Sequence, residues 1–145
     1  RLTTQAASKS LCEHIGSPIF RMEPDLLVEQ GTQRWVADSK WKRIDAGDRE
    51  GKYGLGQADF YQLYAYGKKY LSGNGEMVLI YPKCSTFLRP LPVFDFGDGL
   101  RLWALPFDLD GGRLIHEGLT SLRFRSDKVS APKPQSAANE FTAVA

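Results

Sequence analysis

The stretch "WVADSKWKRI", from Trp35 to Ile44, decides the fold, because it combines the alternation of a β-strand with a cluster of charged side chains. Side chains of a strand point alternately to its two faces. The alternation assigns one face to Trp35, Ala37, Ser39 and Trp41, and the other face to Val36, Asp38, Lys40 and Lys42. We therefore expect one face to pack in a core and the other face to carry a functional site. Both tryptophans are expected to pack in the core or in an interface.

The preceding segment "PIFRMEPDLLVEQ" alternates in the same way, and "QGTQ" between the two segments is typical of a turn. Residues 19–44 therefore predict an antiparallel hairpin whose polar faces can coincide. The segment before Gly16, from Leu2 to Ile15, is interpreted as the remnant of a helix or as a lead-in to the first strand.

Downstream of the hairpin, the sequence predicts an exposed loop, a helix and three further strands. "DAGDREGKYGLG" is rich in glycine and charge, "QADFYQLYAYGKKYL" has apolar residues at helical spacing, and "SGNG" ends that helix. "EMVLIYP" is a nearly apolar run that suits a strand buried on both faces. "PVFDFGDGLRLWALPFDL" predicts a hairpin that turns at Gly97-Asp98-Gly99.

Length and composition indicate one soluble domain. The chain has 145 residues, of which 42% are hydrophobic, and a formal net charge of +2, too small to indicate nucleic-acid binding by itself. We expect a domain over residues 1–125 and a disordered tail over residues 126–145. No apolar run reaches spanning length and no leader precedes the first strand, so a cytoplasmic protein without membrane contact is expected. Because Arg1 stands where a methionine would, the chain is expected to be processed or incomplete.

The residues that carry chemistry are two carboxylates and a lysine. Asp25 follows a proline, and the returning strand carries Asp38, Ser39 and Lys40. Two carboxylates on neighbouring strands can share Mg²⁺, with Mn²⁺ as a substitute, and the backbone carbonyl of Ser39 can add a ligand. Such a metal activates water near neutral pH, and Lys40 can orient that water or offset charge that develops on a phosphate.

Four further residues complete the predicted site. Gln62 and Tyr66 are four residues apart on one helix face, where they can hold the water or a phosphate. Lys42 and Arg43 are expected to steer a DNA backbone toward the metal.

"EPDLLV" followed by "VADSKWKRI", "QADFYQLYAYGKKY" and "VLIYP" resembles the PD-(D/E)xK nucleases, and more narrowly the McrC family of modification-dependent McrBC restriction systems. The resemblance runs from Phe20 to Pro82 and implies an α/β (α+β) fold, a mixed sheet flanked by helices, without part of the family's N-terminal region. It makes Asp25 and Asp38 the metal-binding acids and Lys40 the catalytic lysine, with Gln62 and Tyr66 as an accessory helix motif. Ser39 stands where the family often has threonine, with its side chain expected to face the core.

The same resemblance implies a metal-dependent endonuclease that cuts DNA, methylated at cytosine, together with an McrB-like AAA+ GTPase. Two alternatives stay open from the residues. One is a nuclease of the same fold that acts in DNA repair or mobile-element processing, without the GTPase. The other is a catalytically inactive domain that binds DNA or serves as a scaffold.

Overall fold

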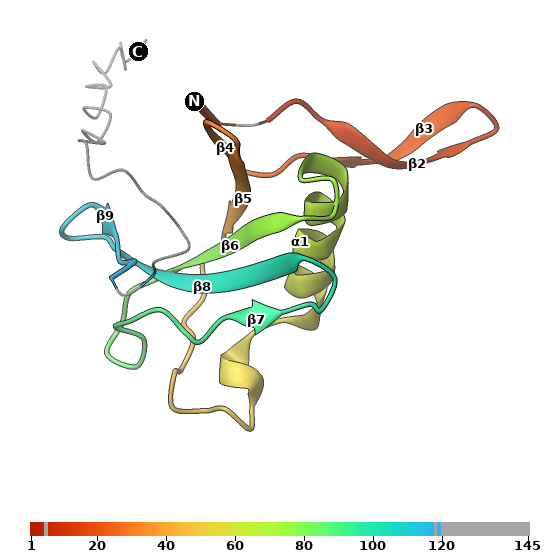
Figure 1. The fold of residues 1–145 in the computed structure, drawn as a ribbon. Coiled ribbons are helices and arrows are strands. Elements are labelled where there is room, and N and C mark those ends of the chain that lie inside the picture. The colour runs from red at the N-terminus through yellow and green to blue at the C-terminus, as the bar shows by residue number, and fades with distance from the viewer. Residues whose placement is uncertain (5, 118, 120–145) are drawn as a thin grey trace, which may run out of the picture.

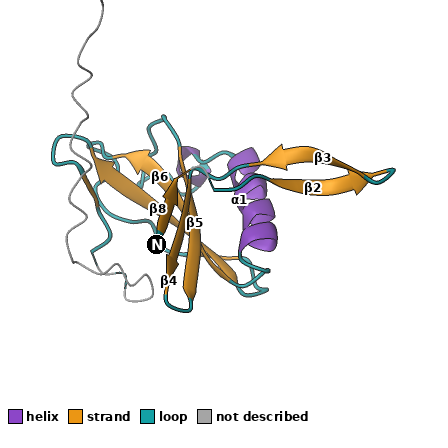
Figure 2. Ribbon diagram, turned by 90° about the horizontal axis from the view of Figure 1, so that it is seen from above, coloured by secondary structure: helices purple, strands orange, loops and turns teal. Residues whose placement is uncertain are grey.

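The computed structural model describes residues 1–4, 6–117 and 119 of the chain (Figure 1). The predicted disordered tail, residues 126–145, and the domain boundary at residue 125 lie outside the described residues. Within the described part, one mixed sheet forms the body, and a separate two-stranded hairpin projects from it (Figures 1 and 2). Among the described residues, no helix is both long enough and apolar enough to cross a membrane.

The body of the molecule is a seven-stranded mixed sheet. Across the sheet its strands follow the order β1 (Leu2–Thr4), β4 (Leu26–Gln30), β5 (Gln33–Ser39), β6 (Gly75–Pro82), β8 (Leu100–Asp108) and β7 (Phe94–Asp95), with β9 (Arg113–Leu114) paired to β8. β4 and β5 form the predicted antiparallel hairpin, with Leu26 opposite Ala37. β7 and β8 form the second predicted hairpin. Both hairpins are thus confirmed, although the strands of the first are shorter than expected.

β6 is the central strand, and it is parallel to both of its neighbours, β5 and β8. Met77, Val78 and Leu79 are fully buried, because β6 is covered on both faces. The apolar run "EMVLIYP" therefore forms the buried strand that its composition predicts.

Helix α1 (Gln57–Tyr70) covers one face of the sheet (Figure 2). Leu63 lies in the core on this face together with Val36 and Leu79 of the sheet. A short 3-10 element, η1 (Lys52–Gly54), precedes α1 in the predicted loop. The predicted α+β architecture with a mixed sheet is confirmed, and within the described residues a single α-helix flanks it.

The prediction of a helix remnant near the N-terminus is wrong. The residues expected to form a helix remnant form strands β1 and β2 (Lys9–His14), and β2 pairs with β3 (Ser17–Met22) around a turn at Ile15 and Gly16. Both turn residues have positive φ, +50° and +73°, which closes the hairpin tightly. The expected long strand over "PIFRMEPDLLVEQ" is therefore two strands, β3 and β4, divided at Pro24 and Asp25.

Candidate metal-dependent active site

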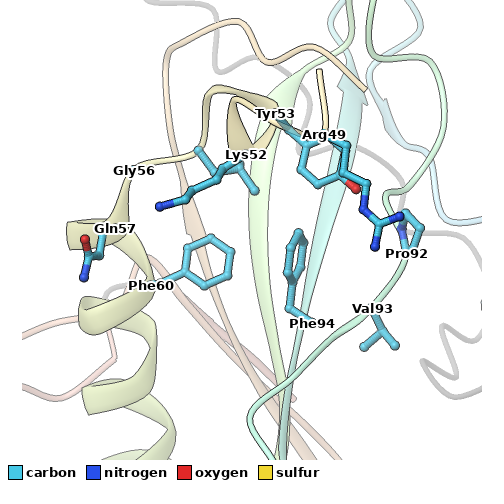
Figure 3. Close-up of a pocket in the computed structure, with 10 residues that line it drawn as sticks. Arg49, Lys52, Tyr53, Gly56, Gln57, Phe60, Pro92, Val93 and Phe94 are labelled. Atoms are coloured by element: carbon cyan, nitrogen blue, oxygen red, sulfur yellow. The ribbon is translucent and has the colours of Figure 1, made fainter. Parts of the chain in front are cut away.

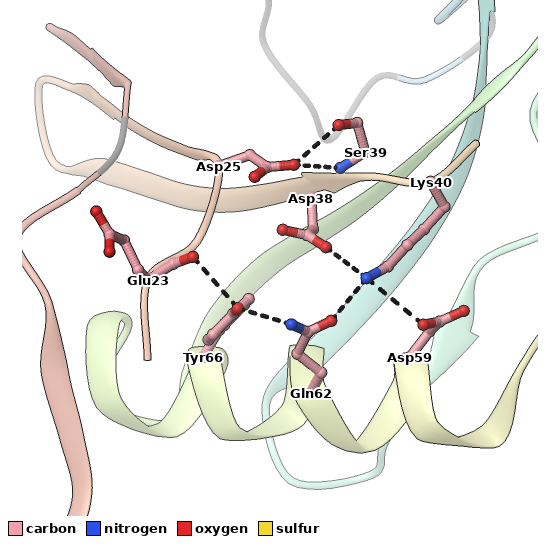
Figure 4. Close-up of polar contacts among 8 residues, drawn as sticks. All are labelled: Glu23, Asp25, Asp38, Ser39, Lys40, Asp59, Gln62 and Tyr66. Atoms are coloured by element: carbon pink, nitrogen blue, oxygen red, sulfur yellow. Dashed lines mark hydrogen bonds and ion pairs between the residues drawn. The ribbon is translucent and has the colours of Figure 1, made fainter. Parts of the chain in front are cut away.

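The structure brings six predicted site residues together at the end of β5, where α1 passes beneath the strand (Figure 4). They are Asp25, Asp38, Ser39, Lys40, Gln62 and Tyr66. Asp25 lies at the bend that precedes β4, and Asp38 and Ser39 are the last residues of β5. Gln62 and Tyr66 face them from α1.

Asp25 is fixed to the end of β5 by Ser39. The backbone N–H and the hydroxyl of Ser39 both donate to Oδ2 of Asp25, each at 2.8 Å. The side chain of Ser39 is therefore exposed and engaged with Asp25, and the expectation that it faces the core is wrong. The prediction failed because Ser39 is the last residue of β5. At this position its side chain meets Asp25 at the bend before β4 instead of the core.

Asp38 and Lys40 form an ion pair, with Nζ of Lys40 2.7 Å from Oδ2 of Asp38. Asp38 is only 5% exposed, and among the described residues it is the one buried polar or charged side chain. The side chain of Lys40 stays 24% exposed, so its ammonium group lies between the buried carboxylate and solvent.

A chain of hydrogen bonds fixes the position of Lys40. Nζ of Lys40 donates to Oε1 of Gln62 at 2.8 Å, and Nε2 of Gln62 donates to the hydroxyl of Tyr66 at 2.9 Å. The Tyr66 hydroxyl in turn donates to the backbone carbonyl of Glu23 at 3.4 Å. Gln62 and Tyr66 thus connect the lysine to the segment that carries Asp25 (Figure 4).

Asp59 is a site residue that sequence reasoning missed. Its Oδ1 lies 3.5 Å from Nζ of Lys40, so the lysine contacts two carboxylates. The available signal was its spacing, three residues before Gln62 and seven before Tyr66, which places all three on one helix face.

Tyr81 of β6 was missed as well. The ring is fully buried against Phe87, and its hydroxyl has no hydrogen-bond partner among the described residues. Burial raises the pKa of Tyr81, and the charges of Asp59 and Asp38 add to that effect. No signal in the apolar run "VLIYP" distinguishes this tyrosine from a core residue.

The electrostatics of the site follow from burial and from its two close carboxylates. Burial raises the pKa of Asp38, and the charge of Asp25 adds to this, while the hydrogen bond from Lys40 acts in the opposite direction. Burial alone lowers the pKa of Lys40, but its pairing with Asp38 and Asp59 outweighs that effect and raises it. Lys40 therefore stays protonated, and the buried carboxylate favours a cation beside it.

The basic segment that follows β5 is exposed. Lys42 and Arg43 point to solvent, as a DNA-contacting role requires. Trp41 is 81% exposed, so it does not pack in the core, and packing in an interface stays a prediction. β5 ends at Ser39, and the alternation of faces that assigned Trp41 to the core does not continue past the strand end.

The donor set fits a hard cation such as Mg²⁺. Its side-chain ligands would be the carboxylates of Asp25 and Asp38, with the backbone carbonyl of Ser39 as a third donor. Both bonds from Ser39 end on Oδ2 of Asp25, and within the described ranges no hydrogen bond reaches Oδ1. Across the same residues no cluster of three or more His, Cys, Asp or Glu side chains could hold a metal ion. Mg²⁺ tolerates so few protein ligands because it keeps several waters.

Comparison with known proteins identifies the family. A family model described as "McrBC 5-methylcytosine restriction system component" matches residues 1–82, more than half of the chain. The chain belongs to this McrBC family. The resemblance to McrC proteins deduced from the sequence is therefore confirmed at the level of the family.

A solved structure supports the fold. The chain is similar to a chain in the refined half-complex from a tetradecameric assembly of Thermococcus gammatolerans McrB AAA+ hexamers with bound McrC, with a TM-score of 0.53 and 18% identity. The match covers 80% of this chain and 25% of that chain, so this McrBC family chain spans about a quarter of the neighbour's length. A search of curated proteins gives no match.

Proposed function

We propose that this chain is the DNA-cleaving part of an McrBC-type restriction system, in which it hydrolyses phosphodiester bonds in a Mg²⁺-dependent reaction. The observation that carries the proposal is the position of Lys40. Its ammonium group lies 2.7 Å from Asp38 and 2.8 Å from Gln62, at the strand end where Asp25 also lies. A buried acid, a second acid and a fixed lysine at one strand end suit hydrolysis of a phosphodiester better than they suit a stabilising ion pair.

Asp25, Asp38 and the backbone carbonyl of Ser39 would hold the metal, which when bound polarises a phosphoryl oxygen and lowers the pKa of a coordinated water. The chain's own groups prepare this position. Ser39 holds the Asp25 carboxylate by two hydrogen bonds, and burial keeps Asp38 away from competing water.

Lys40 would act on the reacting phosphate. Its ammonium group is charged and partly exposed, so it can donate a hydrogen bond to a phosphate oxygen and offset the negative charge that grows in the transition state. Gln62 and Tyr66 would act as positioning residues, because they contact Lys40 and the Glu23 carbonyl. Lys42 and Arg43 would bind the DNA backbone beside this centre.

The substrate and partner of the proposed system follow from the family. The matching family is described as a component of a 5-methylcytosine restriction system, which supports methylated DNA as the substrate. The similar solved structure contains McrB AAA+ hexamers with bound McrC. We infer that this chain works with an McrB-like AAA+ GTPase that selects the DNA, in the cytoplasm where that DNA lies.

The test is cleavage of methylated and unmethylated plasmid DNA by the complete protein that contains this chain, mixed with the AAA+ GTPase of the same system, GTP and Mg²⁺. The proposal expects cleavage of the methylated plasmid, loss of cleavage with EDTA, and loss in Lys40→Ala and Asp38→Ala. Lys69→Gln, which changes an exposed lysine at the far end of α1, serves as the matched control.

The two alternatives predict different results in the same assay. A repair or mobile-element nuclease would cut unmethylated DNA without the GTPase. An inactive DNA-binding or scaffold domain would bind DNA regardless of Mg²⁺, with an affinity that Asp38→Ala does not change. Either result would contradict the proposed function.

A further inference from the structure

A cavity of about 490 Å³ lies at the N-terminal end of α1, separate from the residues assigned to the metal and to Lys40 (Figure 3). Its walls come from η1, the first turn of α1 and the segment that leads into β7. Small-molecule sites typically have volumes of about 300–1,000 Å³ and mostly apolar walls with a few polar groups. This cavity meets both conditions.

Aromatic rings form the apolar part of the cavity. The rings of Phe60 and Phe94 meet edge to face, with centroids 5.1 Å apart, and Tyr53 contacts Phe94 in the same way at 6.2 Å. Phe60 and Phe94 are only partly buried, so ring surface stays open to the cavity (Figure 3). Flat aromatic faces of this kind can stack against any of the four nucleobases, because every base has a π-face.

The charged groups that line the cavity are all cationic. Arg49 and Lys52 are exposed at its edge, and no acidic residue belongs to its lining. The N-cap of α1, Gly56, has no side chain to accept hydrogen bonds from the first backbone N–H groups, and the carboxylate of Asp59 in the same turn offsets part of the positive polarity of this helix end. An anionic group such as a phosphate is the complementary ligand.

The cavity lies beside the proposed cleavage centre. Gly56 lines the cavity, and a Cβ built on it would lie 3.0 Å from Oδ2 of Asp59 and 3.5 Å from Nζ of Lys42. Asp59 in turn contacts Lys40. A DNA strand whose phosphate meets Lys40 can therefore pass Lys42 and reach the cavity.

We propose that this cavity binds one unpaired nucleotide of the DNA strand near the scissile phosphate, with the base against Phe60 and Phe94 and a phosphate on Arg49 and Lys52. The inference rests on the proposed function, because it takes DNA to be the substrate. It adds a subsite that requires the strand to be locally unpaired. Cleavage would then depend on local opening of the duplex at this position.

The test uses the mononucleotide dTMP with the complete protein in EDTA, so that binding does not depend on metal or cleavage. Backbone amide signals of the ¹⁵N-labelled protein are followed during titration with dTMP and, separately, with 2-deoxyribose 5-phosphate. We expect dTMP to shift signals of Lys52, Gly56, Gln57 and Phe94, and to bind more tightly than the sugar phosphate. Lys52→Gln should weaken dTMP binding about tenfold, as the loss of one charge-assisted hydrogen bond predicts.

Lys69→Gln is the matched control, because Lys69 lies on the same helix about 18 Å from Gln57 along the axis. Equal affinity for dTMP and for the sugar phosphate would overturn the proposal, since the rings would then contribute nothing. Absence of binding, or equal weakening by both variants, would overturn it as well. If dTMP binds as expected but the complete system does not cut DNA, the subsite stands and the proposed function fails. If DNA is cut but dTMP does not bind, the proposed function stands and the subsite fails.

Discussion

Nζ of Lys40 lies 2.8 Å from Oε1 of Gln62, so a residue of α1 22 positions further along the chain determines where the lysine that follows β5 points. The amide of Gln62 can take this orientation because its Nε2 donates to Tyr66. The two bonds agree with the positioning role proposed for Gln62.

Gln62→Ala should therefore lower kcat for DNA cleavage while leaving DNA affinity and KM nearly unchanged. The reason is that Lys40 loses the partner that holds it, and small misplacements of a reacting group can cost about 100-fold in rate. Steady-state kinetics with the reconstituted system measure both constants. Gln62→Glu keeps an oxygen acceptor for Lys40 and should retain more activity than Gln62→Ala. A rise in KM at constant kcat would contradict this role.

Metal binding should stabilise the folded chain through Asp25 and Asp38. A ligand that binds only the folded state stabilises it by about 2.7 kcal/mol when its concentration is 100 times Kd. We expect Mg²⁺ or Mn²⁺ to raise the melting temperature of the parent but not of Asp25→Ala or Asp38→Ala. Asp98→Asn, which removes an exposed carboxylate paired with Lys68, is the control and should respond like the parent. A cooperative melt of the parent without any metal response would contradict the metal site.

The elements that were predicted correctly are those whose signal lies within one short stretch of the sequence. The helical spacing of "QADFYQLYAYGKKYL" and the apolar run "EMVLIYP" each depend on short-range patterns, and both became the elements expected, α1 and β6. The proximity of Asp25 to Asp38 could be anticipated because the β4–β5 pairing, with Leu26 opposite Ala37, brings the bend before β4 next to the end of β5.

The incorrect predictions depend on where regular structure stops. Alternation assigned Trp41 to the core, but β5 ends at Ser39, and Lys40 N–H donates to the Ile80 carbonyl at 2.9 Å as the chain leaves the sheet. The β2–β3 hairpin was missed because its turn places Ile15, a β-branched residue, at positive φ. The complete burial of Tyr81 depends on its packing against Phe87, which no local pattern encodes.

Tyr81→Phe should leave the free energy of unfolding at pH 7 unchanged, or raise it by up to about 1 kcal/mol, because the buried hydroxyl has no partner among the described residues. Tyr70→Phe is the matched control. The Tyr70 hydroxyl has two carbonyl acceptors for its single hydrogen, Ala7 at 2.7 Å and Met22 at 3.0 Å, so its removal should cost about 1 kcal/mol. Urea denaturation of both variants makes the comparison. A larger loss for Tyr81→Phe than for Tyr70→Phe would contradict the assignment.

Alkaline pH should widen the difference in the free energy of unfolding between Tyr81→Phe and the parent, in favour of the variant. Burial raises the pKa of Tyr81 in the folded state, whereas the unfolded chain releases this proton near its ordinary pKa of about 10. The unfolded state thus binds fewer protons, and the stability of the parent falls as the pH rises through about 10. Phenylalanine does not titrate, so the variant avoids this part of the loss. Unfolding measured from pH 8 to pH 11 tests the sign.

Lys42→Gln and Arg43→Gln should each reduce the salt dependence of DNA binding. Each lost phosphate contact lowers the slope of log K against log salt concentration by about 0.9 for duplex DNA and about 0.7 for single strands. Fluorescence anisotropy of a labelled oligonucleotide at several salt concentrations in EDTA gives the slope. Lys69→Gln, at the far end of α1, should leave it unchanged. Identical slopes for all three variants would show that the segment after β5 does not contact the backbone.

Gly67→Ala should destabilise the fold that presents the site, although alanine favours a helix by about 1 kcal/mol over glycine. A Cβ at this position would lie 2.7 Å from Sδ of Met77 and 2.9 Å from both methyl groups of Leu100. Overpacking of this kind costs about 1–3 kcal/mol, because the helix must move away from β6 and β8. Ala58→Gly on the exposed first turn of α1 provides the comparison, since it changes helix propensity without any core contact. Urea denaturation should show a loss of stability for Gly67→Ala. A gain in stability would mean that α1 can shift outward freely. The contact of α1 with the sheet would then not fix the distance between Gln62 and Lys40.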